Sequence, residues 1–327
     1  MADTTRTDGP DPTPGLLTSL RQPRGWFDRS SDTLFQGTTR AFALLVLLVL
    51  GLMIYETTMT SLPAFAKEGL RFVTGQSWAP SQQQFETLPF VYGTLVTSAI
   101  AMLICVPISI GVALFLSELA PVRLRTPLAY LVDLLAAVPS VVYGLWGVLV
   151  LVPLLGNHVW GPISSATDGF APFAGPATGR SYATAGLILA VMALPIVTAI
   201  TREVIATVPR SHREAALALG ATRWEVIRMA VLPYAKSGIT GAVMLGLGRA
   251  MGETIAVALV IGGSTTISTS LFHPGYTMAA VIANEFPEAT GPHIEALVGV
   301  GVLLFALTLL VNVCARLLVW RTARRLR

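Results

Sequence analysis

Six long apolar stretches dominate this sequence and determine the environment in which the chain can fold. They lie at about 40–61, 89–117, 128–155, 184–205, 236–262 and 296–319. A helix needs about 20 residues to cross the roughly 30 Å of hydrocarbon in a bilayer, so each stretch is long enough. Only 12% of the residues are charged, against about 25% in a typical soluble domain. Because lipid offers the backbone no hydrogen bonds, we predict an all-α polytopic membrane protein with six transmembrane helices.

The Lys and Arg residues are distributed very unevenly between the two sides of these spans. If the N-terminus is cytoplasmic, cytoplasmic segments carry 18 of the 22 basic residues, external segments carry three, and Arg249 lies inside a span. Cytoplasmic loops of membrane proteins are enriched in Lys and Arg. We therefore expect a multi-pass protein of the cell (plasma) membrane with both termini in the cytoplasm. The net charge of +4 follows from this topology, and we predict no nucleic-acid partner.

Residues 209–233, between the fourth and fifth stretches, form a polar segment with signals for two short helices. Each helix would begin at a capping box, in which a Ser or Thr and a Glu three residues later bond the free amides of the first turn; the pairs are Ser211 with Glu214 and Thr222 with Glu225. Gly220 would end the first helix, because glycine adopts the left-handed conformation at little cost. Pro233 would end the second. We call residues 209–233 the elbow segment and expect it to contact a partner.

The elbow segment resembles the EAA loop of the membrane subunits of ABC importers, whose pattern is EAA, three residues, Gly, nine residues and Ile-x-Leu-Pro. Six residues match the pattern: Glu214, Ala215, Ala216, Gly220, Leu232 and Pro233. Ala230 stands at the Ile position. The resemblance implies that these residues, with Arg223, couple the chain to a cleft of an ATP-hydrolysing subunit. The alternative is an ordinary cytoplasmic helix-turn-helix between two spans.

No ATPase site is encoded in the chain. A phosphate-binding P-loop requires the pattern G-x-x-x-x-G-K-[ST], and the only two lysines, Lys67 and Lys236, do not follow a glycine. We therefore predict a transport subunit without enzymatic activity and without a bound cofactor, whose ATP is used by a partner ATPase subunit.

The fifth stretch contains two opposite charges, Arg249 and Glu253, four residues apart. A charge at the bilayer centre costs on the order of 2.5–3.5 kcal/mol, and such residues usually face a partner or a cavity. On a continuous helix the two side chains would lie one turn apart on the same face. They would then form a structural ion pair, or Arg249 would line a translocation path and bind an oxyanion with its guanidinium group. A further charge, Asp133, is expected to be interfacial or paired with Arg123 or Arg125.

Three further motifs resemble the phosphate ABC importer permeases, and more specifically the PstC type. They are GRAMGETIAV at 248–257, VPSVVYGLWGVLVLVP at 138–153 and MAAVIANEF at 278–286. The resemblance covers about residues 88–320 and implies a MetI-like permease core. It also implies an assembly with a homologous second permease subunit (PstA type), an ATP-binding subunit dimer (PstB type), an extracytoplasmic phosphate-binding protein (PstS type) and the lipid bilayer.

Four segments follow from these assignments. Residues 1–38 form a polar cytoplasmic tail, 39–87 the first span and an external loop, 88–320 the permease domain with its elbow segment, and 321–327 a basic cytoplasmic tail. The expected function is the channel-forming subunit of an ATP-driven, high-affinity inorganic phosphate importer. Three alternatives stay open: a permease for another oxyanion such as sulfate or molybdate, an ATP-independent channel or carrier, and an additional sensor role.

Overall fold

The computed structural model describes residues 26–167, 170–175 and 177–324. Within these ranges, six helical segments are long and apolar enough to cross a membrane: Leu34–Glu68, Leu88–Leu119, Ser140–Ala166, Tyr182–Ala206, Arg223–Gly252 and Pro292–Leu317. The prediction of an all-α protein with six spans is therefore confirmed. The bounds of the third and fifth spans differ from the predicted ones, and both differences have a local cause.

Contacts along the chain divide it into two units, Met1–Tyr55 and Glu56–Arg327. The described part of the first unit is the beginning of α1 (Trp26–Glu68). All its side chains from Leu34 to Tyr55 are exposed although most are apolar, as expected of a helix whose solvent is lipid. The tail predicted at 1–38 already becomes helical at Trp26, and its first 25 residues lie outside the described part.

The core of the second unit is the contact between α3 (Leu88–Leu114) and α8 (Tyr182–Ala206). Gly186 of α8 lies directly against Ile100 of α3, so a Cβ at this position would overlap the Ile side chain. Thr97 and Ser98 of α3 donate hydrogen bonds to carbonyl oxygens one turn earlier, over 2.8 and 2.6 Å. Small residues allow close helix packing in lipid, and these hydroxyls are satisfied within their own helix.

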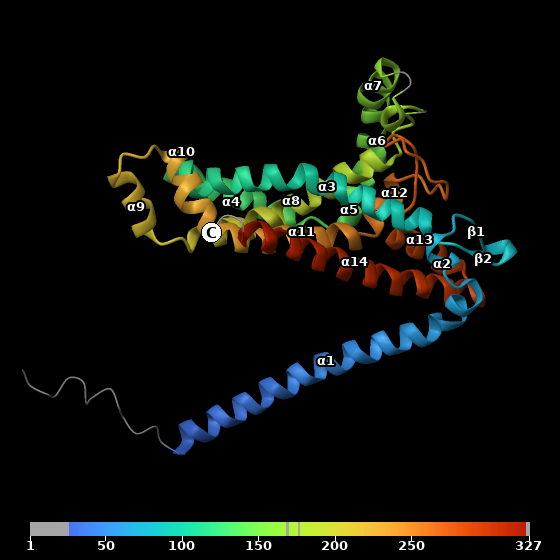
Figure 1. The fold of residues 1–327 in the computed structure, drawn as a ribbon, viewed down its shortest axis with the longest axis horizontal. Coiled ribbons are helices and arrows are strands. Elements are labelled where there is room, and N and C mark those ends of the chain that lie inside the picture. Colours follow the sequence, from blue (N-terminus) through green and yellow to red (C-terminus); the bar gives the residue numbers. More distant parts are fainter. Residues whose placement is uncertain (1–25, 168–169, 176, 325–327) are drawn as a thin grey trace, which may run out of the picture. The chain divides into compact units, whose positions relative to one another are not determined.

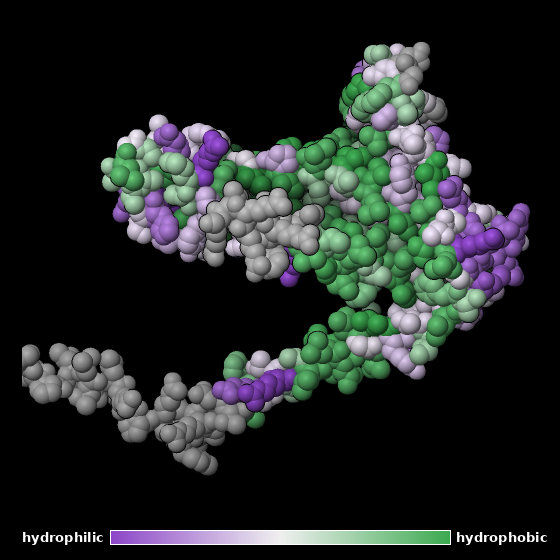
Figure 2. All heavy atoms as spheres, in the orientation of Figure 1, coloured by the Kyte–Doolittle hydropathy of each residue, from purple (hydrophilic) through white to green (hydrophobic). Residues whose placement is uncertain are grey.

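Polar elements lie at opposite ends of the second unit. One end carries α9 (Arg210–Ala218) and α10 (Arg223–Val226), and the other carries α2 (Arg71–Thr74) with a hairpin of β1 (Trp78–Ala79) and β2 (Gln84–Phe85) (Figure 1). Figure 2 shows hydrophilic residues at both ends and an apolar surface between them. This pattern fits a bundle whose middle lies in lipid and whose two ends lie in water.

An aromatic and charged cluster holds the hairpin end together. Glu285, at the end of α13 (Met278–Glu285), accepts hydrogen bonds from the Trp78 indole and from His293 Nε2, both over 2.9 Å. The His293 ring stacks on Phe85 with a centroid separation of 5.8 Å. His293 lies in the first turn of α14 (Pro292–Arg324), so the cluster joins the hairpin to the last two helices. Residues 325–327 of the predicted C-terminal tail lie outside the described part.

The third span begins later than predicted. The sequence stretch 128–155 is broken between α4 (Val122–Ala137) and α5 (Ser140–Trp146). Val138 has extended dihedrals, φ −67° and ψ 127°, because the ring of the following Pro139 disfavours the helical conformation. After α5 the helix continues through η3 (Gly147–Leu151), α6 (Val152–Leu155), η4 (Gly156–Trp160) and α7 (Gly161–Ala166).

Candidate functional site

The first helix of the elbow segment, α9, begins and ends at the predicted places, but its first cap is different. Pro209 is the N-cap residue, and no side chain caps the helix. The predicted capping box of Ser211 and Glu214 is therefore wrong: Ser211 lies inside α9, whereas the N-cap residue must precede the first helical residue. At the other end Gly220 has φ +82°. Its amide bonds to Leu217 O over 2.9 Å, and Ala221 N bonds to Ala216 O over 3.1 Å, which is the Schellman C-cap.

The second helix of the elbow segment begins as predicted and continues further. Thr222 and Glu225 form a capping box: Thr222 N donates to Glu225 Oε2 over 2.7 Å, and Glu225 N donates to Thr222 Oγ1 over 3.4 Å. Pro233 does not end this helix, contrary to the prediction. The π turn η6 (Ile227–Val231) leads directly into α11 (Leu232–Gly252). Its wider turn changes the bonding partners in front of Pro233, so the missing proline N–H breaks no helix.

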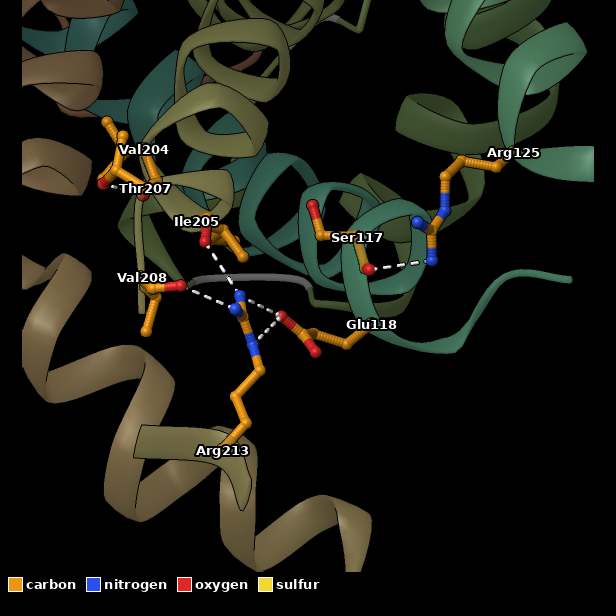
Figure 3. Close-up of polar contacts among 8 residues, drawn as sticks. All are labelled: Ser117, Glu118, Arg125, Val204, Ile205, Thr207, Val208 and Arg213. Atoms are coloured by element: carbon orange, nitrogen blue, oxygen red, sulfur yellow. Dashed lines mark hydrogen bonds and ion pairs between the residues drawn. The ribbon is translucent and has the colours of Figure 1, made fainter. Parts of the chain in front are cut away.

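A clamp at Arg213 fixes α9 to the bundle (Figure 3). Arg213 Nη2 and Nε donate to Glu118 Oε1 over 2.8 and 3.1 Å. Arg213 Nη1 and Nη2 also donate to the carbonyl oxygens of Val208 and Ile205, over 2.6 and 3.0 Å. Glu118 belongs to η2 (Phe115–Leu119), the end of the second span, and Ile205 belongs to the last turn of α8. The guanidinium group therefore joins the elbow segment to the ends of two spans.

The outer face of the elbow segment carries an apolar groove of about 480 Å³. Three predicted site residues, Ala215, Ala216 and Gly220, line it together with Ala221, Glu225, Met229 and Ala230. Leu219 also lines it, with an exposed fraction of 89%. A soluble surface rarely exposes apolar side chains in a contiguous patch unless it binds something. The groove therefore has the composition of a docking surface.

The remaining predicted residues of the elbow segment do not line this groove. Glu214 points to the other side of α9, where it lines a second cavity near Arg213. Arg223 is exposed, and it makes no hydrogen bond or ion pair with any described residue. Leu232 is half-buried and Pro233 is exposed, both at the start of α11. The residues of the EAA-loop pattern thus lie in three places: the apolar groove, the second cavity and the start of α11.

Arg249 and Glu253 do not lie on one helical face. The helix α11 ends at Gly252, and Glu253 has extended dihedrals of φ −70° and ψ 129° before the short α12 (Ile255–Val260). The ion pair, one of the two alternatives for these charges, is therefore absent from the described residues, because the four-residue spacing needs a continuous helix to bring the charges together. Arg249 is exposed and Glu253 is half-buried. The fifth span is a broken helix, and the break lies between its two charges.

A hydroxyl group of the third span has a hydrogen-bond partner, whereas Arg249 of the fifth span has none among the described residues. The Tyr143 hydroxyl of α5 donates to Leu135 O of α4 over 2.8 Å, so it links these two helices across the break at Pro139. The guanidinium donors of Arg249, in α11, are unused by any described residue.

Two ion pairs of the structure were not predicted from the sequence. Asp133 is 3.7 Å from Arg202 of α8, and it pairs with neither Arg123 nor Arg125. The Arg213–Glu118 clamp joins residues that lie far apart in the chain, and no spacing rule relates them. Among the described residues, no group of three His, Cys, Asp or Glu side chains could hold a metal ion.

The matches to known proteins agree with this arrangement. The family of the binding-protein-dependent transport system inner membrane component matches residues 106–327. The chain belongs to this family. It is 46% identical over 300 residues to the phosphate transport system permease protein PstC of Mesorhizobium japonicum, covering 90% of this chain and 92% of that protein. It is 40% identical over 306 residues to the PstC protein of Haemophilus influenzae, covering 92% and 97%.

Chains in solved structures of ABC transporters have a similar fold. A bacterial alginate ABC transporter in complex with its pentasaccharide-bound periplasmic protein has a TM-score of 0.62 at 17% identity, covering 92% of this chain and 98% of that chain. An inward-facing MetNI methionine ABC transporter has a TM-score of 0.53 at 18% identity, covering 76% and 99%. At such low identity the likeness concerns the fold alone, and it confirms the predicted MetI-like permease core.

Proposed function

We propose that this chain is the channel-forming subunit of an ATP-driven importer of inorganic phosphate. The observation that carries the proposal is a combination of two features. The elbow segment is fixed to the bundle by Arg213 and exposes an apolar groove, and Arg249 in the fifth span has no hydrogen bond or ion pair with any described residue. The names of the relatives in Mesorhizobium japonicum and Haemophilus influenzae support phosphate as the transported anion. A homologous second permease, two ATPase subunits and an extracytoplasmic phosphate-binding protein would complete the assembly.

The elbow segment would dock on the ATPase through its apolar groove. Ala215, Ala216 and Gly220 have small or no side chains, so they leave room for a complementary side chain of the partner. The end of the unit that carries this segment would be cytoplasmic, as the excess of Lys and Arg around it favours. Both termini would then also be cytoplasmic, and the hairpin end would face the binding protein.

The clamp at Arg213 would transmit motion of the docked segment into the membrane. Because one guanidinium group bonds Glu118 and two carbonyl groups of α8, α9 cannot shift without moving the ends of the second and fourth spans. The continuous helix from Arg223 to Gly252 carries the same motion to the fifth span. ATP binding by the partner would in this way switch the bundle between inward-open and outward-open states.

Arg249 would bind the anion during translocation. An unpaired Arg in a membrane span is costly unless it faces water or a partner, and its planar guanidinium group matches the oxygens of a tetrahedral oxyanion. Glu253, on the other side of the helix break, would repel the anion and keep its binding weak enough for release. The chain itself would catalyse no bond chemistry.

Uptake of labelled phosphate by cells that lack only this gene tests the proposal, with excess unlabelled sulfate or molybdate as competitor. We expect the deletion to remove a saturable component that sulfate and molybdate do not inhibit, and the intact gene to restore it. If sulfate or molybdate displaces this component, the substrate is another oxyanion. If the purified chain transports phosphate alone in liposomes without ATP, it is a channel or carrier.

A further inference from the structure

A cavity of about 660 Å³ lies beside the clamp, on the opposite side of α9 from the apolar groove. Four arginines from three elements line it: Arg125 of α4, Arg202 of α8, and Arg210 and Arg213 of α9. Figure 3 shows two of them, Arg125 and Arg213, on either side of the end of the second span. The cavity has no part in the docking or translocation described above.

The arginines of this cavity have many more hydrogen-bond donors than acceptors to receive them. Each guanidinium group carries five N–H donors. Arg213 is used by the clamp, but Arg125 makes one bond, from Nη2 to Ser117 O over 2.9 Å. Arg202 Nη2 is 3.7 Å from Asp133 Oδ2, which is too long for a hydrogen bond. Arg210 has no hydrogen bond or ion pair with any described residue. Arg125, Arg202 and Arg210 therefore all keep unused N–H donors, and Arg202 is also in an ion pair with Asp133.

Three glutamates line the cavity; Glu118 is already bonded to Arg213 in the clamp, and the other two limit how tightly an anion can bind there. Glu203 and Glu214 also line the cavity, and both are exposed. Neither forms an ion pair with the arginines within the described part of the chain. Their negative charge lowers the affinity for any anion, so the cavity suits a ligand that is abundant or held close to it. Such a ligand must offer several oxygens, because the open donors come from three different helices.

We propose that this cavity binds a phosphate-bearing anion through Arg125, Arg202 and Arg210. A phosphate group has three or four acceptor oxygens and more than one negative charge, so it can bond guanidinium groups of α4, α8 and α9 together. A carboxylate has only two oxygens and a single negative charge, so it offers these three groups fewer acceptors and less charge than a phosphate does. The source is either free inorganic phosphate or the headgroup of an anionic phospholipid. In both cases the bound anion adds a second link between α9 and the bundle, beside the clamp.

Hydrogen–deuterium exchange of the full-length chain in nanodiscs tests this site. Two samples use phosphatidylcholine discs, one with inorganic phosphate in the buffer and one with sodium chloride at the same ionic strength. A third sample uses discs that contain phosphatidylglycerol, in a buffer free of inorganic phosphate. Bound ligand slows exchange through local opening by a factor of one plus the ratio of its concentration to Kd. At ten times Kd we expect exchange in 210–218 to slow about tenfold. Protection by phosphate identifies the free anion, and protection by phosphatidylglycerol alone identifies the headgroup.

Matched variants separate the cavity from general effects of charge. The double variant Arg125→Gln with Arg210→Gln should lose the protection while exchange in α3 and α8 stays as in the wild type. Arg123→Gln, on the same helix as Arg125 but outside the cavity lining, should keep it. Arg249→Gln should also keep it, so the result is independent of the translocation site. The proposal is overturned if neither ligand protects 210–218, or if Arg123→Gln loses the protection as well.

Discussion

Arg213 and Glu118 join the elbow segment to the second span by a two-point contact, with Nη2 and Nε at 2.8 and 3.1 Å from one carboxylate oxygen. Both side chains are mostly buried, with exposed fractions of 21% and 16%. Partly buried, charge-assisted bonds of this kind contribute about 1.5–3 kcal/mol each when one partner is removed. The contact is therefore strong enough to make α9 part of the bundle, and its loss has measurable consequences.

Arg213→Lys should uncouple transport from ATP hydrolysis. A Lys keeps the charge but lacks the planar fork that reaches Glu118 and two carbonyl groups at once. We expect phosphate uptake to fall strongly while the chain still inserts and still co-purifies with its ATPase. Uptake and co-purification measured in the same membranes check this. Arg123→Lys, which alters no contact among the described residues and lies outside the cavity lining, is the control; normal uptake by Arg213→Lys would contradict the transmitting role.

Gly220→Ala should destabilise the elbow segment through its backbone alone. Gly220 has φ +82°, and an added Cβ would meet no atom within 4 Å, so the cost is the left-handed strain of about 1–2 kcal/mol. We expect faster hydrogen exchange in 209–222 and weaker ATPase pull-down. Gly241→Ala adds a Cβ that also meets no atom within 4 Å, in an ordinary helical conformation. It should be neutral or slightly stabilising, and equal effects of the two would refute the argument.

Thr222→Ala should loosen the start of the fifth span. The capping box at Thr222 and Glu225 supports the first turn of a helix that runs to Gly252, and removal of such a cap costs about 1 kcal/mol. Exchange of the amides at 223–226 should accelerate, with little change in α8. Thr222→Ser keeps the hydroxyl and should leave exchange unchanged. A similar acceleration in both variants would show that the cap does not hold this turn.

Exchanging the two charges of the fifth span should not restore transport. Because the helix ends between Arg249 and Glu253 and no ion pair joins them among the described residues, the variant Arg249→Glu with Glu253→Arg moves the guanidinium group away from its place. We expect uptake as low as in Arg249→Gln. Uptake by the exchanged variant at the wild-type rate would mean that the two charges form a structural pair.

The fold could be predicted from the sequence, but the form of the site could not. Apolar length gives the six spans, and the capping signals at Thr222 and Gly220 give the elbow, because both depend on neighbouring residues. Pro139 and Pro233 look alike in sequence. One breaks a helix and the other is accommodated by a π turn, and the tertiary packing that decides between these outcomes cannot be deduced from the chain.

The charged contacts show the same limit. The spacing of Arg249 and Glu253 predicts a pair only if the helix continues, and Gly252 ends it. Glu118 and Arg213 are distant in sequence, so their contact depends on how α9 folds back onto the bundle. Local rules therefore identified residues of the site, while their partners followed from tertiary structure.

Reconstitution of the complete importer in proteoliposomes tests the central claim most directly. With ATP inside and phosphate-loaded binding protein outside, phosphate accumulation and ATP hydrolysis would be measured together for the wild type and for Arg249→Gln. We predict that the wild type accumulates phosphate. We predict that Arg249→Gln still hydrolyses ATP but accumulates phosphate only at the background level. Equal accumulation by the two proteins would contradict the account, because Arg249 would then have no part in moving the anion.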